Sequence, residues 1–213
     1  MNTTAPLNTL NDAKNNVMNT KIRSDFALIT NWIQPNTKIL DLGCGDGGLL
    51  THLHRERNIR GYGVEKDDAN WLAAMENGVN VIQMDLEAGL SGFEDASFDT
   101  VILSQTLQAM HNTEGIVHEM LRVGREVIVT FPNFGYWRNR VQILAGQMPV
   151  SKILPYEWYN TPNVHLCTIH DFDAFCQQHA IEVMERKVIT EGNTVQFMPN
   201  LLGNLAMYRL HKT

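Results

Sequence analysis

The sequence has few cysteines and a shortage of positive charge. Its three cysteines, Cys44, Cys167 and Cys176, are an odd number and show no C-x-x-C or Cys/His ligand spacing. Neither a disulfide framework nor a metal site is therefore expected. Lys and Arg number 17 against 23 Asp and Glu, which gives a net charge of -6. This charge predicts repulsion from phosphate backbones, so nucleic acid is not expected as a partner.

Long apolar runs are also missing. No run approaches the roughly 20 residues that span a bilayer, and the amino end lacks the basic and apolar regions of a signal peptide. We therefore expect a cytoplasmic protein with no membrane partner. Asn and Thr are frequent in residues 1–20, which we expect to form a flexible extension. The remaining residues, 21–213, are expected to form a single domain, because their number and the 44% hydrophobic content of the chain suffice for one buried core.

Short apolar runs alternate with helical spacings along most of the chain. The runs predict strands at 38–42, 60–65, 79–84, 98–104, 127–131, 181–190 and 205–211. Helical spacing predicts a helix from Ile22 to Pro35 and others at 48–55, 69–77, 113–123 and 169–179. This alternation predicts a Rossmann-like α/β fold, with a mostly parallel seven-stranded sheet and helices on both faces. Residues 132–168, rich in Pro, Tyr and Trp, break the rhythm and predict an irregular insertion.

A glycine-rich turn follows the first predicted strand. Its sequence, Asp41-Leu-Gly-Cys-Gly-Asp-Gly47, places Gly43, Gly45 and Gly47 between the strand and a helix. Glycines let the backbone approach a ligand closely, and the free N–H groups at the start of the helix favour an anionic group. In S-adenosylmethionine that group is the methionine carboxylate. The turn therefore predicts a nucleoside site at the carboxyl ends of the strands.

A dinucleotide is the competing ligand for this turn. Gly43, Gly45 and Gly48 also match G-x-G-x-x-G, and Glu65 follows at about the distance that a dinucleotide site requires. Asp41 distinguishes the two ligands, because its charge would repel a pyrophosphate but attract an ammonium or sulfonium group. The sequence thus favours S-adenosylmethionine, or S-adenosylhomocysteine, and leaves a dinucleotide as the alternative.

Other residues at strand ends complete the predicted site. Glu65 ends the second strand, where one carboxylate can accept from both ribose hydroxyls. Asp85 ends the third strand, where its carboxylate can accept from the adenine amino group, and Leu86 can flank the ring. Gln105, just past the fourth strand, would face the ligand from the other side. Alternatively, either acid caps a helix or is solvated, and Gln105 bonds backbone.

These residues resemble motif I and the strand-end acids of class I methyltransferases. A more specific resemblance, from about Ile22 to Val188, is to the MetW family of methionine biosynthesis proteins. Four stretches carry it: Val101-Ile-Leu-Ser-Gln-Thr-Leu-Gln108, Phe131-Pro-Asn-Phe-Gly135, Met148-Pro-Val150 and Trp158-Tyr-Asn-Thr-Pro-Asn-Val-His-Leu-Cys-Thr168. The resemblance implies a methyltransferase-like fold and work with a MetX-type homoserine O-acyltransferase. Gly48 and Asn160 depart from the family pattern, where acidic residues are usual.

Methyl transfer by the chain itself is a separate question. Ser104-Gln-Thr-Leu107 stands where methyltransferases of exocyclic amines carry Asn/Asp-Pro-Pro-aromatic. If the chain methylates a small molecule, the candidates for a general base or a substrate ligand are His111, Tyr136, Tyr159 and His165. A lone His or Tyr in a loop is more often a packing or hydrogen-bonding residue. Aromatic and arginine side chains of the insertion have the composition of interface anchors and would equally suit a lid: Tyr136, Trp137, Arg138, Arg140, Tyr156, Trp158 and Tyr159.

Two functional hypotheses follow. The favoured one is an S-adenosylmethionine-binding accessory subunit that associates with and supports homoserine O-acyltransferase in L-methionine biosynthesis, with residues 132–168 as the candidate contact surface. The alternative is an autonomous S-adenosylmethionine-dependent small-molecule methyltransferase. A dehydrogenase ranks third.

Overall fold

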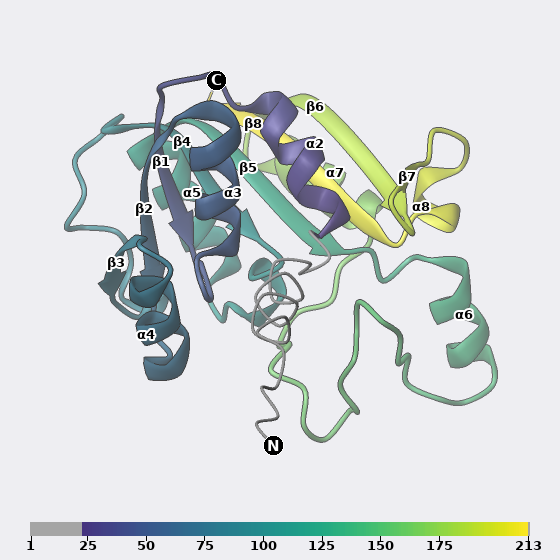
Figure 1. Cartoon of the computed structure of the whole chain (residues 1–213). Coiled ribbons are helices and arrows are strands. Elements are labelled where there is room, and N and C mark those ends of the chain that lie inside the picture. The colour runs from purple at the N-terminus through teal and green to yellow at the C-terminus, as the bar shows by residue number, and fades with distance from the viewer. Residues whose placement is uncertain (1–22, 213) are drawn as a thin grey trace, which may run out of the picture.

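The fold is built on one sheet whose strands run in the order β3-β2-β1-β4-β5-β8-β6-β7 (Figure 1). The computed structural model describes residues 23–212, so the flexible extension expected at 1–20 lies outside them. The strands are β1 (Lys38–Leu42), β2 (Arg60–Glu65), β3 (Asn80–Gln83), β4 (Phe98–Ser104), β5 (Gly124–Pro132), β6 (Ile181–Thr190), β7 (Asn193–Thr194) and β8 (Leu205–Lys212). The α-helices are α2 (Ser24–Trp32), α3 (Gly48–Arg57), α4 (Asp68–Glu76), α5 (Thr113–Val123), α6 (Trp137–Leu144), α7 (Ile169–Gln178) and α8 (Pro199–Leu202).

The first five strands are parallel and place β1 near the middle of the sheet. β1 pairs with β2 on one side and with β4 on the other. β3 extends the sheet beyond β2, and β5 extends it beyond β4. The strand order therefore reverses between β1 and β4. In open α/β sheets, ligands bind outside the carboxyl ends of the strands at such a point.

The C-terminal strands make the sheet mixed and raise its strand count. β8 pairs antiparallel with β5, and β6 pairs antiparallel with β8. The expected count of seven is wrong, because the two-residue β7 adds an eighth strand at the end of β6. The turn between them uses Glu191 and Gly192, both with positive φ. A strand of two residues has too little alternation to be read from sequence. The expected α/β fold is otherwise confirmed.

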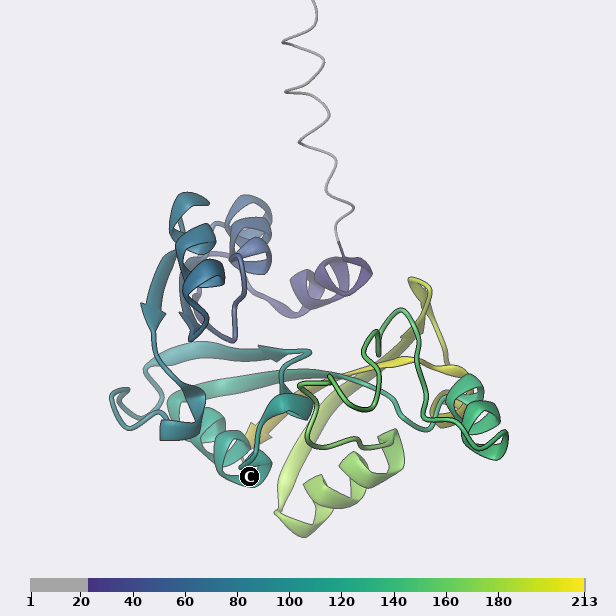
Figure 2. The ribbon, with the colours of Figure 1, turned by 90° about the horizontal axis from the view of Figure 1, so that it is seen from below.

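Helices cover both faces of the sheet, as Figure 2 shows from its edge. Side chains of β1 alternate between two apolar clusters: Leu40 and Leu42 point into one and Ile39 into the other. α5 and α7 contribute to the first cluster, and α2 and α3 contribute to the second. Burial on both sides explains why these strands read as apolar runs. Every helix within residues 23–212 is too short or too polar to cross a bilayer.

The segment between β5 and α7 contains a helix that the sequence analysis missed. The expectation of an irregular insertion is wrong for the eight residues of α6, whereas 145–168 form neither helix nor strand. Buried Asn139 anchors α6 by donating to the backbone carbonyl of Asn133. Asn133, itself 1% exposed, donates to the carbonyls of Asn200 and Gly203. Two buried amides therefore hold the insertion against the end of the sheet.

Candidate nucleoside site at the strand ends

The glycine turn connects β1 to α3 through left-handed backbone. The φ angles of Gly43, Gly45 and Gly47 are 67°, 57° and 75°, a region that other residues rarely adopt. A Cβ at Gly43 would lie 2.8 Å from Thr106 Oγ1, and one at Gly47 would lie 2.6 Å from a Val79 methyl. Packing therefore also requires these two glycines. A Cβ at Gly45 would meet no atom within 4 Å, so Gly45 presents bare backbone to open space.

Asp41 is a buried carboxylate with an unpartnered oxygen. It lies inside β1, opposite Gly63 of β2 and Ile102 of β4, and is 2% exposed. Its Oδ1 has no hydrogen-bond partner within the described part of the chain. Burial raises the pKa of Asp41 to about 7; the guanidinium of Arg23 lowers it, and the carboxylate of Glu65 raises it further. Since an unpaired buried acceptor is costly, a donor brought by a ligand would be stabilising here.

Glu65 holds the glycine turn against the end of β2, which ends at this residue as predicted. One carboxylate oxygen accepts from the N–H of Gly45 at 2.9 Å. The other oxygen accepts from the N–H groups of Lys66 and Asp67 at 2.8 and 2.9 Å. Because a carboxylate offers about four acceptor positions, Glu65 keeps capacity for a ligand hydroxyl.

Asp85 and Leu86 lie beyond β3, which ends at Gln83 rather than at residue 84. Asp85 is exposed, and its Oδ1 accepts from the N–H of Glu87 at 3.1 Å and caps the short 3-10 helix η1 (Leu86–Ala88). The capping contact considered as the alternative is therefore present. Leu86 is 8% exposed and packs in the apolar cluster beneath α5. Most of the Leu86 side chain is therefore packed in the core.

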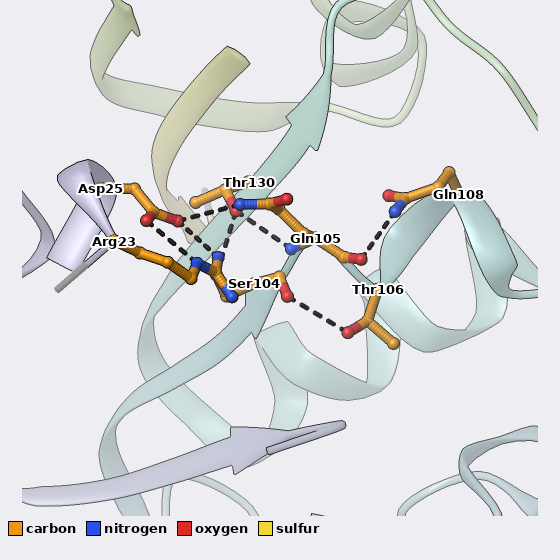
Figure 3. A network of polar contacts seen from close by, with 7 residues as sticks. All are labelled: Arg23, Asp25, Ser104, Gln105, Thr106, Gln108 and Thr130. Atoms are coloured by element: carbon orange, nitrogen blue, oxygen red, sulfur yellow. Dashed lines mark hydrogen bonds and ion pairs between the residues drawn. The ribbon is translucent and has the colours of Figure 1, made fainter. Parts of the chain in front are cut away.

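Gln105 belongs to a polar network that the sequence analysis did not find. Figure 3 shows Arg23 and Asp25, from the start of α2, meeting Ser104 at the end of β4 and Gln105 just after it. Asp25, 2% exposed, accepts from the guanidinium of Arg23 at 2.5 Å and from Gln105 Nε2 at 3.2 Å. Arg23 also donates to Ser104 Oγ at 2.9 Å. Gln105, whose φ is 56°, donates its backbone N–H to Thr130. The Gln105 amide thus bonds a carboxylate and not backbone.

An apolar cavity of about 200 Å³ lies beyond β4 and β5. Its walls are Leu107, Gln108, Thr113, Phe131, Pro132, His165, Cys167, Asp171, Phe172 and Phe175. Burial raises the pKa of the Cys167 thiol to about 12, which makes it a poor nucleophile. Among the predicted bases, His165 Nε2 lies 3.2 Å from the backbone oxygen of His111. Tyr136 is buried beside the Trp137 ring, and Tyr159 is 70% exposed.

These parts combine into a negatively charged rim with an open stretch of backbone. Asp41 and Glu65 are both buried at the ends of neighbouring strands, and Gly45 lies between Glu65 and open space. A pyrophosphate would meet two buried carboxylates here, whereas a cation would be attracted. The arrangement therefore suits a cationic nucleoside better than a dinucleotide.

A family model described as "Methionine biosynthesis protein MetW" matches residues 23–210. The chain is 35% identical over 194 residues to the bifunctional methionine biosynthesis protein MetXA/MetW of Rhodopirellula baltica. The match covers 84% of this chain but 31% of that protein. The chain thus spans about a third of the length of this curated relative.

Solved structures with the same fold include methyltransferases and a [4+2]-cyclase. A SAM-dependent methyltransferase from Thermotoga maritima superposes with a TM-score of 0.65 at 18% identity, over 89% of this chain and 88% of that one. Magnesium protoporphyrin IX methyltransferase from Synechocystis, crystallised with bound SAH, gives a TM-score of 0.61 at 14% identity. That match covers 99% of this chain and 90% of the methyltransferase. At such identities the likeness shows the fold.

Proposed function

Since this chain belongs to the MetW family of methionine biosynthesis proteins, we propose that it is an S-adenosylmethionine-binding subunit that associates with and supports a homoserine O-acyltransferase. Ligand binding rests on the strand-end site, and the partnership rests on the family and on an exposed apolar surface.

The unpartnered oxygen of Asp41 is the observation that carries the ligand proposal. Asp41 Oδ1 is buried and accepts no hydrogen bond from the described residues. The ammonium group of S-adenosylmethionine is a cationic donor of the kind that this oxygen needs. The residues proposed to hold the ligand are Asp41, Gly43, Gly45, Gly47, Glu65, Asp85, Leu86 and Gln105. When bound, the sulfonium of the ligand supplies an activated methyl group.

Each of these residues has a distinct proposed task. Asp41 pairs with the ammonium, and the backbone of Gly45 lies along the ligand where no side chain intervenes. Glu65 accepts from a ribose hydroxyl with its remaining acceptor position, and Asp85, exposed beside the site, accepts from the adenine amino group. Arg23 adds a guanidinium near these acids, where it can meet the ligand carboxylate.

The partner proposal draws on the composition of the relative and on the surface of the insertion. In the Rhodopirellula baltica protein, a MetXA part and a MetW part share one chain, which is consistent with a need for proximity. Three apolar side chains of this insertion are largely exposed: Leu144 at 87%, Trp158 at 72% and Tyr159 at 70%. Exposed Trp and Tyr are common anchors of protein interfaces. We place the contact with the acyltransferase on this surface.

Co-purification tests the partnership. A MetX-type homoserine O-acyltransferase mixed with this chain should elute as a complex in size-exclusion chromatography, and its activity should rise. Trp158→Ala combined with Tyr159→Ala should abolish both effects, because it removes two interface anchors. Leu72→Ala is the matched control, since Leu72 is a 51%-exposed apolar residue on α4, at the opposite end of the sheet. A wild-type chain that neither binds nor activates the acyltransferase would contradict the proposal.

An autonomous small-molecule methyltransferase is the second candidate, and the apolar cavity favours it. The cavity beyond β4 and β5 could admit part of an apolar acceptor, with His165 as its basic lining residue. This function predicts that S-adenosylhomocysteine forms when a panel of pathway metabolites is supplied. The accessory function predicts that none forms, while acyltransferase activation persists.

A further inference from the structure

Three metal-ligating side chains meet on the surface, apart from the nucleoside site. Glu114 and His118 lie one turn apart on α5, and His179 follows α7 as its C-terminal cap. Their donor atoms all lie within 4.8 Å of one another. The cysteine spacings predict no metal site, and a spacing motif does not link His118 with His179, which are 61 positions apart.

The distances among the three donor atoms fit one metal ion. His118 Nε2 lies 3.4 Å from His179 Nδ1, and Glu114 Oε1 lies 3.5 Å from His179 Nδ1 and 4.0 Å from His118 Nε2. A point equidistant from all three atoms lies about 2.1 Å from each, which matches zinc bonds to imidazole nitrogen and carboxylate oxygen. Little side-chain movement is needed to close such a site.

The least exposed of the three ligands is held in place before any metal arrives. The backbone N–H of His179 caps α7 by donating to the carbonyl of Phe175 at 3.0 Å. Its ring lies 4.5 Å from the Phe175 ring and 5.4 Å from the His118 ring, and its side chain is 18% exposed. A ligand fixed by packing loses little freedom on binding. His118 and Glu114, at 48% and 62% exposed, leave the metal accessible from solvent.

We propose that Glu114, His118 and His179 bind a divalent transition-metal ion, with zinc the best match. Two imidazoles and one carboxylate are an established zinc ligand set, and three protein ligands leave a fourth position for water. α5 and α7 pack in the same apolar cluster, so the ion would join the first half of α5 to the end of α7. The alternative is a trio held by hydrogen bonds and ion pairs, which at exposed positions contributes little.

Zinc titration of the full chain tests this site. Isothermal calorimetry under reducing conditions should show one zinc ion per chain, and zinc should raise the midpoint of thermal unfolding. His118→Ala and His179→Ala should each weaken zinc binding about tenfold or more and remove the thermal shift. Cobalt bound at the site should give the visible absorption of a four-coordinate ion, and both variants should lose it.

His170→Ala is the matched control, because His170 is exposed on α7 outside the cluster. It should bind zinc and cobalt as the wild type does. The proposal is overturned if the wild type binds no zinc, or if His118→Ala and His179→Ala both bind it with wild-type affinity. Variants that fold without metal, as shown by unchanged circular dichroism, exclude misfolding as the cause of a loss.

Discussion

Replacing Asp41 with Asn should make the free protein less sensitive to rising pH. The pKa of Asp41 is raised by burial from 3.8 to about 7. Between these values the folded protein holds a proton that the unfolded chain has released. The stability contributed by this carboxyl is therefore fully present below pH 3.8 and is lost as the pH rises through 7.

The size of the effect follows from the pKa. Each pH unit below the folded pKa is worth about 1.4 kcal/mol, so this carboxyl contributes about 3 kcal/mol more at pH 5 than at pH 8. Asn has no proton to lose. From pH 5 to pH 8 the free energy of unfolding of Asp41→Asn should therefore improve by about 3 kcal/mol relative to the wild type. Any cost of fitting the Asn amide is the same at both pH values and cancels.

Urea unfolding at pH 5 and pH 8 measures this difference. Other titrating groups are common to both proteins. Glu94→Gln, which removes an exposed carboxylate, is the control, and its free energy of unfolding should change between the two pH values as that of the wild type does. If Asp41→Asn and the wild type change in parallel between the two pH values, Asp41 is not a buried carboxyl with a raised pKa. The argument for a site that awaits a cationic donor would then fail.

Further substitutions test the surroundings of this carboxylate. Gly45→Ala should weaken S-adenosylmethionine binding and lower the free energy of unfolding by about 1 kcal/mol, because the φ of Gly45 is 57°. Gly78→Ala is the control, since Gly78 has a φ of 76° and a Cβ there would also meet no atom within 4 Å. It should cost the same stability and leave the affinity for S-adenosylmethionine, measured by calorimetry, unchanged. Arg23→Ala should raise the pKa of Asp41, since the guanidinium lowers it, as a carboxyl carbon NMR titration can show. Asn133→Ala should lower the free energy of unfolding in urea by about 3 kcal/mol, because buried carbonyls lose their donors; a loss below about 1 kcal/mol would contradict that role.

The strands near the site could be predicted because their apolar runs are continuous. The predicted bounds of β1 and β4 agree with the structure, since burial on both faces leaves few polar residues inside them. The bounds of β2 agree as well, although only its last three residues are buried. The glycine turn was likewise found from its spacing. Asp41 lies at the predicted position, as the penultimate residue of β1, but its burial depends on the neighbouring strands and could not be read from the sequence.

Features that depend on distant contacts could not be predicted. Arg23 reaches Ser104 and Asp25 reaches Gln105 across about 80 residues, because α2 docks beside the end of β4. An Arg-x-Asp pair at the start of an apolar helix was the only local signal. α6 depends on Asn139, which is buried against the end of β5 by the tertiary fold. A local pattern does not contain such contacts.

Calorimetric titration with S-adenosylmethionine tests the central claim most directly. At pH 8 the full chain should bind one molecule of S-adenosylmethionine and no NAD, and its affinity should change when the acyltransferase is present. Asp41→Asn should weaken binding about 30-fold or more, because a buried charge pair loses one partner. Binding of NAD in place of S-adenosylmethionine, or wild-type affinity in Asp41→Asn, would contradict the account.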